Sequence, residues 1–518
     1  MKSNLVVLIN PSHDDEIPEK IAVSYGAKSR KVRRYDPPIS IINLGGFIRD
    51  HGYDVVILDT LVEENYQDKL KQLIKERPLI IGFSVILGKF TKNAITLTKM
   101  IKEMNQDIPV VWGGKLVHLA QDLILDHLDV DYIVVGDGEI PFLNLLDNLK
   151  NGKMHEIPGI GFKENGHTKI NLNEYTIENL DDIYISKDFG WDLVKQNLNM
   201  RQTPYFVNLY TSRGCKFNCS FCYLKDIRGL ASKLRFRRRS AENVISEIEY
   251  LHKKYGINVV TFGDDDFLSN LKEVKPIFEY LKKNNIFIEH LWTNVYNLNP
   301  AAIELLAGTC QTVCYSIETV SPRLQKILNK HISLDRIIKA NKQLRSAGIT
   351  TVHNILFGIP TETDDETKAN IDCLKILKDI NPHVRANTYI LSPIPETPIF
   401  EFAKTVSKQN IEWGMEDLAN FHFRYMGKTA SKFRPYLTGD DNLFYETVSE
   451  LTNELFTELN DVPSEEQVMK MRNDKRLSYI FGDIDKINKP TEKVRKYILD
   501  QVIESLDQGL PMPRIESF

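Results

Sequence analysis

The segment Arg213-Gly-Cys-Lys-Phe-Asn-Cys-Ser-Phe-Cys-Tyr223 is the part of the sequence from which the rest can be interpreted. It carries three cysteines, Cys215, Cys219 and Cys222, in the pattern C-x3-C-x2-C. Thiolates are the usual protein ligands of iron–sulfur clusters, and a cubane cluster has four irons. Three ligands from one loop therefore leave one iron open to a substrate or cofactor.

Other cysteine motifs match this segment less well. An electron-carrier ferredoxin adds a fourth cysteine, and a zinc ribbon needs a second C-x2-C pair. The chain has only 6 cysteines in 518 residues, and half of them lie between positions 215 and 222. A metal cluster is therefore favoured over incidental thiols. The other three, Cys310, Cys314 and Cys373, lie in apolar contexts and are expected in the core.

Length and composition predict a globular protein of two to four domains. Hydrophobic residues make up 42% and charged residues 26%, and the net charge of −4 gives no sign of nucleic-acid binding. Apolar runs are too short for a signal peptide or a transmembrane segment. The cysteines are clustered rather than spread as a disulfide framework, which predicts a cytoplasmic protein.

Residues 1–150 alternate short apolar runs with amphipathic segments, which predicts an α/β domain with a doubly wound, Rossmann-like sheet. Strands are expected at Leu5–Ile9, Val55–Leu58, Leu79–Ser84, Val110–Trp112 and Tyr132–Val135. No G-x-G-x-x-G follows the first strand, which disfavours a dinucleotide. A charged insertion at residues 12–38 would hang over the carboxyl edge of the sheet.

The strand ends of this domain are rich in glycine and serine. They read Gly82-Phe-Ser84, Trp112-Gly-Gly114 and Gly136-Asp-Gly-Glu139. In a parallel sheet these ends share one edge, where ligands bind. Glycine permits close approach to a flat ligand, although the glycines also suit a role as simple strand terminators.

Residues 151–205 are predicted to be a linker with a small hairpin around Asn165-Gly166. Residues 206–400 resume the alternation and predict a partial (β/α)6 barrel with a lateral gap. Its strands are expected at Phe206–Tyr210, Val259–Phe262, Ile286–Trp292, Val313–Ile317, Thr351–Leu356 and Arg385–Ile390.

The cysteine loop follows the first of these strands, so it is expected at the carboxyl mouth of the barrel, where active sites form. Polar residues end the later strands, and four are candidate catalytic residues: Asp266, Glu318, His353 and Tyr389. Ser316 and Glu318 alternate along a strand and are expected to face inward together. The alternative for Asp264, Asp265 and Asp266 is that they cap the helix after Leu268.

Residues 401–518 are predicted to form a mostly helical C-terminal domain. Helices are expected at Asp441–Leu459, Ser464–Arg472 and Glu492–Asp507. An aromatic-rich passage comprises Phe400, Trp413, Phe421, Phe423 and Tyr425. It is expected to pack against the barrel, or to close the lateral gap and shape the substrate pocket.

At this point the chain resembles the radical S-adenosylmethionine (SAM) enzymes, and among them the class B methyltransferase-like group with an N-terminal cobalamin-binding domain. The resemblance covers about residues 1–400. It rests on the cysteine loop with Phe221 and on five further motifs. These are Val134-Val-Gly-Asp-Gly-Glu139, Tyr210-Thr-Ser-Arg-Gly-Cys215, Phe262 to Phe267, Tyr315-Ser-Ile-Glu318 and Phe357-Gly-Ile-Pro-Thr-Glu362.

The resemblance implies three cofactors and the residues that hold them. The three cysteines of the loop would bind a [4Fe–4S] cluster. Residues implied to contact SAM are Phe221, Gly263, Asp264, Asp265, Ser316, Glu318, Ile355 and Pro360. Residues implied to line cobalamin are Ser84, Leu87, Gly113, Gly114, Gly136 and Gly138.

The sequence departs from relatives of that group in two places. The D-x-H-x-x-G motif, which places a histidine under cobalt in cobalamin mutases, is absent. Where many members read G-G-x-H, this chain reads Gly113-Gly-Lys-Leu-Val-His118, so His118 is displaced. Any cobalamin here would lack that lower ligand, and His118 is expected near the surface.

The function implied is reductive cleavage of SAM, hydrogen abstraction from a substrate, and methyl transfer from cobalamin to carbon. The protein would bind and orient the cofactors and the substrate, and it would exclude water from them. Expected partners are a small-molecule or natural-product substrate and an external electron donor, flavodoxin or ferredoxin. The alternatives are a cyclase or rearrangement enzyme of the same family, and a non-catalytic iron–sulfur or cobalamin protein with electron-transfer duty.

Overall fold

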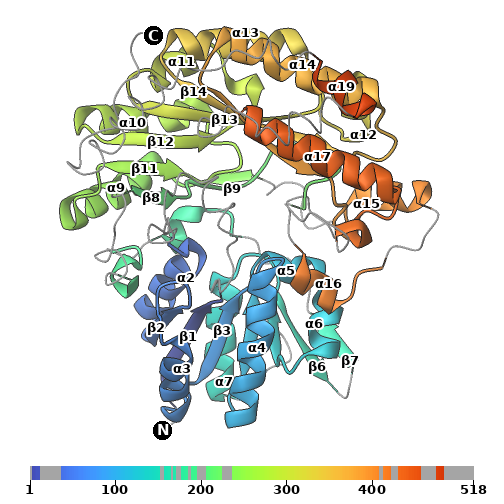
Figure 1. Ribbon diagram of the computed structural model, residues 1–518. Coiled ribbons are helices and arrows are strands. Elements are labelled where there is room, and N and C mark those ends of the chain that lie inside the picture. Colours follow the sequence, from blue (N-terminus) through green and yellow to red (C-terminus); the bar gives the residue numbers. More distant parts are fainter. Residues whose placement is uncertain are drawn as a thin grey trace.

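Figure 1 shows the computed structural model, in which two α/β units are joined by irregular segments and a C-terminal helical region. The structure describes residues 3–11, 37–151, 157–164, 167–170, 177–184, 188–194, 206–223, 236–407, 412–421, 430–456 and 474–482. Most of the insertion at 12–38 lies outside them. So do the predicted helices Ser464–Arg472 and Glu492–Asp507, and Phe423 and Tyr425.

The first unit is a seven-stranded sheet with the order β2-β1-β3-β4-β5-β6-β7. Its parallel strands are β1 (Leu5–Asn10), β2 (Asp54–Asp59), β3 (Ile80–Ser84), β4 (Val110–Gly113) and β5 (Tyr132–Val134). All five expected strands are confirmed. The predicted hairpin is also present as β6 (Ile160–Glu164) and β7 (His167–Ile170). It extends this sheet, because β6 pairs antiparallel with β5 and covers an otherwise open edge.

Helices cover both faces of this sheet, which confirms the doubly wound arrangement. One face packs against α2 (Ile39–Asp50) and α7 (Glu139–Asn151). The other packs against α3 (Tyr66–Lys75), α4 (Lys89–Met104) and α6 (Gln121–His127). Helix α6 is preceded by a separate short helix, α5 (Lys115–Leu119). Ala120 divides the two because its φ of −144° is not helical.

The second unit is a six-stranded parallel sheet with the order β15-β14-β13-β12-β11-β8. Its strands are β8 (Phe206–Leu209), β11 (Val259–Phe262), β12 (Phe287–Trp292), β13 (Cys310–Glu318), β14 (Thr350–Phe357) and β15 (Val384–Ile390). Among the described strands, the outer two, β8 and β15, do not pair with each other. The sheet is therefore a partial barrel, as predicted.

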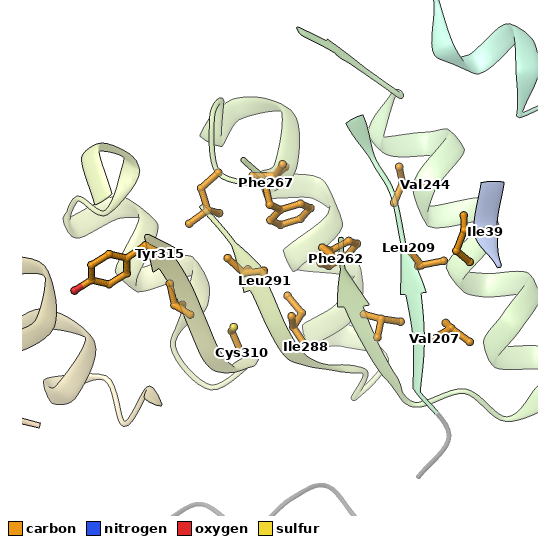
Figure 2. Close-up of a cluster of buried hydrophobic side chains, with 14 of the residues drawn as sticks. Ile39, Val207, Leu209, Val244, Phe262, Phe267, Ile288, Leu291, Cys310 and Tyr315 are labelled. Atoms are coloured by element: carbon orange, nitrogen blue, oxygen red, sulfur yellow. The ribbon is translucent and has the colours of Figure 1, made fainter. Parts of the chain in front are cut away.

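In the described part of the barrel, six helices connect the strands. They are α9 (Ala241–Tyr255), α10 (Leu271–Lys283), α11 (Pro300–Leu306), α12 (Pro322–Ile327), α13 (Leu334–Ser346) and α14 (Asp364–Ile380). Ser240 is the N-cap of α9, and its Oγ accepts a hydrogen bond from Asn243 N at 3.1 Å. The apolar core lies on the helix side of the strands (Figure 2). Ile39 of α2 belongs to the same core and lies beside Leu209 and Val244, so the two units share one buried cluster.

A short antiparallel ribbon, absent from the sequence analysis, flanks the cysteine loop. It consists of β9 (Ser212–Gly214) and β10 (Phe236–Arg238). Three-residue strands give too short a pattern for period-two alternation to be recognised.

The C-terminal region contains α15 (Pro398–Val406), α16 (Met415–Asn420), α17 (Gly439–Leu455) and α19 (Lys475–Phe481). Helix α17 covers the barrel edge β15, where Thr388 N donates to Asn453 Oδ1 at 3.0 Å. No described helix has the length and hydropathy needed to cross a bilayer.

The aromatic passage differs from the expectation that it packs against the barrel. Phe400, Trp413 and Phe421 of this passage belong to the buried cluster on the α4 and α6 face of the first unit. Gly88 N donates to Leu418 O of α16 at 2.9 Å. Helix α17, not the aromatic passage, covers the barrel edge at β15. The aromatic side chains pack against the first unit.

Candidate functional site

The cysteine loop lies at the carboxyl end of the barrel strands, as predicted, and is held by backbone contacts from distant segments. Ser220 N donates to Leu328 O at 2.9 Å, and Ser220 Oγ donates to Ile327 O at 2.7 Å. Ile399 N donates to Ser220 O at 3.1 Å. The end of α12 and the start of α15 therefore fix the middle of the loop.

The three thiols fit a cluster site. None of the six cysteines forms a disulfide, and the three in the loop are partly exposed. Burial raises the pKa of Cys215 to about 11 and raises that of Cys219, so a bound metal would be needed to keep them as thiolates. No three described His, Cys, Asp or Glu side chains converge on one point. A cubane does not require such convergence, because each thiolate binds its own iron.

Asp264 supports the backbone that leads into the cysteine loop. Its carboxylate is 1% exposed and accepts hydrogen bonds from Thr211 N at 3.1 Å, Thr211 Oγ1 at 2.7 Å, and the Ser212 hydroxyl. The resemblance implies a SAM contact for Asp264. In the structure the side chain bonds to Thr211 and Ser212, and its SAM contact stays a prediction.

Asp266 joins the ends of β11 and β12. Its Oδ1 atom accepts from Thr293 Oγ1 at 2.9 Å, Asn294 N at 3.0 Å and Asn297 Nδ2 at 2.6 Å. Asp266 is 1% exposed, and its proposed catalytic role stays a prediction. The alternative that these aspartates cap α10 does not hold, because Asn270 is its N-cap.

Asp265 points to a different environment from its two neighbours. Solvent reaches its side chain. Desolvation by the surrounding protein nevertheless raises the pKa of Asp265 to about 6. The positive charge of Lys115 lowers this pKa, whereas the negative charges of Asp264 and Asp266 raise it further. Asp265 is therefore the aspartate of this motif that is open to a cationic ligand.

The free energy of unfolding of the cofactor-free protein should depend on pH through the raised pKa of Asp265. Its pKa rises from 3.8 to about 6, so between these values the folded state keeps a proton that the unfolded state has lost. Raising the pH through this window therefore favours unfolding, and the contribution is constant outside it. We expect the parent to lose stability relative to Asp265→Asn over this window in thermal unfolding. Parallel pH curves for the two proteins would contradict the assignment.

Ser316 and Glu318 do not simply alternate, because the register of β13 against β14 shifts between them. Ser316 Oγ accepts from Asn354 Nδ2 at 3.1 Å. Glu318 has a φ of +65° and accepts from Lys330 Nζ at 3.1 Å, with both side chains at or below 10% exposure. The charges of Lys330 and Glu318 both act on Cys219. No motif in the sequence points to Lys330.

The inner face of the barrel carries a polar row. Ser316, Asn354 and Asn387 are neighbours in register across β13, β14 and β15. Thr388 bonds to Ser449 on α17, so Asn387 and Tyr389 point to the opposite, inner side. The structure thus places Tyr389 where the sequence analysis expected it.

His353 and Ile355 differ from their expected positions at the mouth. Thr351 Oγ1 bonds to Asn341 of α13 at 3.1 Å, so alternate residues of β14 face the helices. His353 is fully buried there, with its ring centroid 4.4 Å from that of Tyr315, and burial lowers its pKa to about 3. Ile355 lies in the same helix-side core. Neither side chain is open to a ligand at the mouth.

Two other residues implied to contact SAM lie on the mouth side. Phe221 packs partly buried against an apolar cluster that includes Leu356 and Ile359, and Pro360 follows directly. Gly263 has no room for a side chain, because a Cβ there would lie 2.7 Å from Asn208 Oδ1 and from the Tyr210 ring.

The edge of the first unit fits a flat ligand. Gly113 and Gly138 are open, since a Cβ at either would have its nearest neighbour at 3.8 Å. Gly114 and Gly136 have φ of +94° and +90°. Ser84 Oγ lies 3.0 Å from Ser40 Oγ, a contact the sequence analysis did not foresee. Leu87 packs partly buried on the helix side, so its corrin contact stays a prediction. His118 is half-buried in α5.

Charged residues between the two units were missed by the sequence analysis. Arg213, directly before the cysteine loop, forms ion pairs with Asp137 and Glu139 of the first unit. Arg237 also pairs with Asp137. Lys115 Nζ donates to Tyr223 Oη at 3.3 Å. These contacts bring the glycine-rich edge of the first unit to the cysteine loop.

The chain matches two family models and several relatives. Residues 209–374 match the Radical SAM superfamily, and residues 30–146 match the B12 binding domain. The chain is 32% identical over 385 residues to "Uncharacterized methyltransferase PH0819" of Pyrococcus horikoshii, covering 73% of this chain and 80% of that protein. It is 24% identical to "Cytidylyl-2-hydroxyethylphosphonate methyltransferase" of Streptomyces wedmorensis, covering 65% and 72%.

Solved structures share the fold at low sequence identity. The radical SAM methyltransferase TsrM from Kitasatospora setae, with cobalamin and a [4Fe–4S] cluster bound, aligns with a TM-score of 0.59 at 19% identity, covering 78% of this chain and 75% of that one. The cobalamin-dependent enzyme OxsB with aqua-cobalamin aligns with a TM-score of 0.64 at 17% identity, covering 98% and 81%. The chain therefore belongs to the radical SAM superfamily, as a member that joins the radical SAM barrel to a B12-binding domain.

Proposed function

We propose that this protein is a cobalamin-dependent radical SAM methyltransferase that acts on carbon. The observation that carries the proposal is the Lys115–Tyr223 contact, which brings the glycine-rich edge of the B12-binding unit to the residue after Cys222. The cobalamin site and the cluster site would therefore adjoin at this contact. The methyltransferase names of the two relatives support the choice of methyl transfer.

The protein uses SAM, a [4Fe–4S] cluster and cobalamin. When bound, the cluster supplies the electron that cleaves SAM, and cobalamin supplies a transferable methyl group. Cys215, Cys219 and Cys222 would hold the cluster. Gly113 and Gly138 would face the corrin, because both lack neighbours on the open side.

The chain's own residues then bind and orient the reactants. Asp265 is the exposed carboxylate of the aspartate motif and suits the cationic amino group of SAM. The Glu318–Lys330 pair beside Cys219 offers a buried cation for a carboxylate. Tyr389 and the polar row at Ser316 and Asn354 would orient substrate by hydrogen bonds. Neutral, buried His353 has no part in this scheme.

The remaining partners follow from this chemistry. The substrate class we propose is a small molecule or natural product with an unactivated C–H bond. The electron donor would be a flavodoxin or ferredoxin. Half of the cysteines lie in one loop and none of the six forms a disulfide, which supports a reducing compartment such as the cytoplasm.

The test is an anaerobic incubation of the reconstituted protein with a reductant, a metabolite mixture and SAM carrying a trideuterated methyl group. We expect 5′-deoxyadenosine and a product that contains the intact labelled methyl group, both dependent on added cobalamin. The Cys219→Ala variant serves as the control without a cluster.

The same assay separates the alternatives. A cyclase or rearrangement enzyme is supported by relatives such as "Anaerobic magnesium-protoporphyrin IX monomethyl ester cyclase" of Synechocystis, 25% identical over 296 residues, which are 55% of this chain and 54% of that protein. Such an enzyme would form 5′-deoxyadenosine and an unlabelled product. A protein that binds a cluster but never forms 5′-deoxyadenosine would overturn the enzyme assignment.

A further inference from the structure

The B12-binding unit contacts the cysteine loop at both of its ends. Arg213 lies two positions before Cys215, and Tyr223 directly follows Cys222. Tyr223 is held by Lys115 at the start of α5, and Arg213 by Asp137 and by Glu139 at the start of α7. Helix α5 and strand β9 lie on the facing sides of the two units (Figure 1).

The upstream contact is a buried ionic network. Arg213 Nη1 lies 2.9 Å from Asp137 Oδ1, and the same guanidinium donates to both carboxylate oxygens of Glu139. Arg237 lies opposite Arg213 in the register of the β9–β10 ribbon. It donates to Asp137 Oδ2 and to Ile177 O. The side chains of Asp137 and Glu139 are 11% and 6% exposed. Both belong to the Gly136-Asp-Gly-Glu139 motif, so its acidic residues serve the interface.

The ionic network fixes the orientation of the two units relative to each other more than it adds to the free energy of unfolding. Buried ion pairs gain little over apolar packing, but a bidentate arginine–carboxylate pair is geometrically specific. Burial raises the pKa of Asp137, yet Arg213 and Arg237 outweigh it and hold the pKa below its usual value. The charges of the network are thus kept at neutral pH.

The downstream contact is made by Lys115, which directly follows Gly113-Gly114. Its Nζ lies 3.3 Å from Tyr223 Oη and 5.2 Å from the centre of the Tyr223 ring. Lys115 is exposed to solvent, and although desolvation by the surrounding protein lowers its pKa, Tyr223 and Asp265 outweigh that effect, so the ammonium stays charged. Among the described residues, no carboxylate forms a salt bridge with Lys115 within 4 Å, which leaves Tyr223 as its direct partner across the interface.

We infer that these contacts couple cobalamin binding on the first unit to cluster assembly on the second. Arg213 and Lys115 act as positioning residues, because they join the two ends of the cysteine loop to the two glycine-rich loops. Coupling of this kind is reciprocal, so each cofactor should tighten the binding of the other by the same factor. The inference rests on the cofactors of the proposed function, not on methyl transfer.

The test is a titration of the full-length protein with hydroxocobalamin, with and without a reconstituted cluster, followed by absorbance. We expect the cluster to lower the dissociation constant by roughly 5–150-fold, the usual range of coupling between sites. In Asp137→Asn/Glu139→Gln the factor should fall toward one. The electron paramagnetic resonance signal of the reduced cluster should broaden in that variant, because the loop is less well fixed.

Milder variants and a control guard against misfolding. Arg213→Lys keeps the charge and should retain part of the coupling, and Tyr223→Phe keeps the ring beneath the Lys115 ammonium but loses the hydrogen bond to Lys115. Arg476→Gln on α19, at a site with 34% side-chain exposure, removes ion pairs to Asp364 of α14 and Asp441 of α17 and should leave the coupling unchanged. Equal dissociation constants with and without cluster in the parent would overturn the inference. So would an unchanged factor in the double variant and in Tyr223→Phe.

The outcome is distinct from a failure of the proposed function. A parent protein that forms a labelled methyl product but shows no coupling overturns the inference alone. A parent protein that shows coupling but forms only unlabelled product overturns methyl transfer alone.

Discussion

Replacing Cys219 by alanine should remove the iron–sulfur cluster and abolish 5′-deoxyadenosine formation. Three thiolates from one loop are the expected protein ligands, and two cannot hold a cubane against loss to solvent. Changing residues that merely support a metal ligand costs about 10–100-fold in affinity or activity. Loss of a ligand itself should exceed that range. The measurements are the visible absorbance of the reconstituted protein and chromatography of the nucleoside product.

A matched control is available in the same chain. Cys373 lies on α14, is 2% exposed and belongs to the helix-side core. Cys373→Ala removes one thiol without touching the loop, so it should keep the absorbance and the activity. A Cys219→Ala protein that still cleaves SAM would refute the cluster assignment, and so would a Cys373→Ala protein that specifically loses the cluster.

Gly114→Ala should strongly disturb the B12-binding unit. Gly114 has φ of +94° and ψ of −176°, a region that is essentially restricted to glycine. A Cβ there would lie 2.7 Å from Val85 O and 2.8 Å from Val85 N, which are backbone atoms of the neighbouring strand end. Strain of this type costs about 1–3 kcal/mol, and the clash adds to it. We expect a lower unfolding midpoint in urea and a weaker hydroxocobalamin titration.

The adjacent glycine provides the control. At Gly113 the nearest atom to an added Cβ is 3.8 Å away, so Gly113→Ala should unfold close to the parent. If Gly113 faces the corrin, its substitution should weaken cobalamin binding without loss of stability. Parent-like stability in Gly114→Ala would show that the loop relaxes around the new methyl group, contrary to this prediction.

Much of the fold was accessible from local pattern. The expected strands of both sheets were confirmed because buried parallel strands are continuous apolar runs with clear boundaries. The open barrel followed from counting six such units. The domain boundaries at 150, 205 and 400 stay predictions, and the hairpin at Ile160–Ile170 shows that a sheet extends past the first of them.

Side-chain placement in the site was less accessible. Period-two alternation says that His353 and Asn354 point to opposite faces, but not which face is covered by helices. The bond from Thr351 to Asn341 settles that His353 is on the helix side. The three consecutive aspartates look alike in the sequence, yet Asp264 and Asp266 are buried acceptors and Asp265 is exposed. Their hydrogen-bond donors come from other segments, residues 211–212 for Asp264 and residues 293–297 for Asp266.

The sequence by itself determined the three-thiolate loop, its place after the first barrel strand and the glycine-rich edge of the first sheet. These are properties of spacing and short-range pattern. Only the tertiary structure decided that Arg213 and Tyr223, at the two ends of that loop, are held by Asp137, Glu139 and Lys115. The reason is physical: an ion pair or a hydrogen bond needs atoms within about 4 Å, and its partners here are separated by some 70 to 110 positions along the chain.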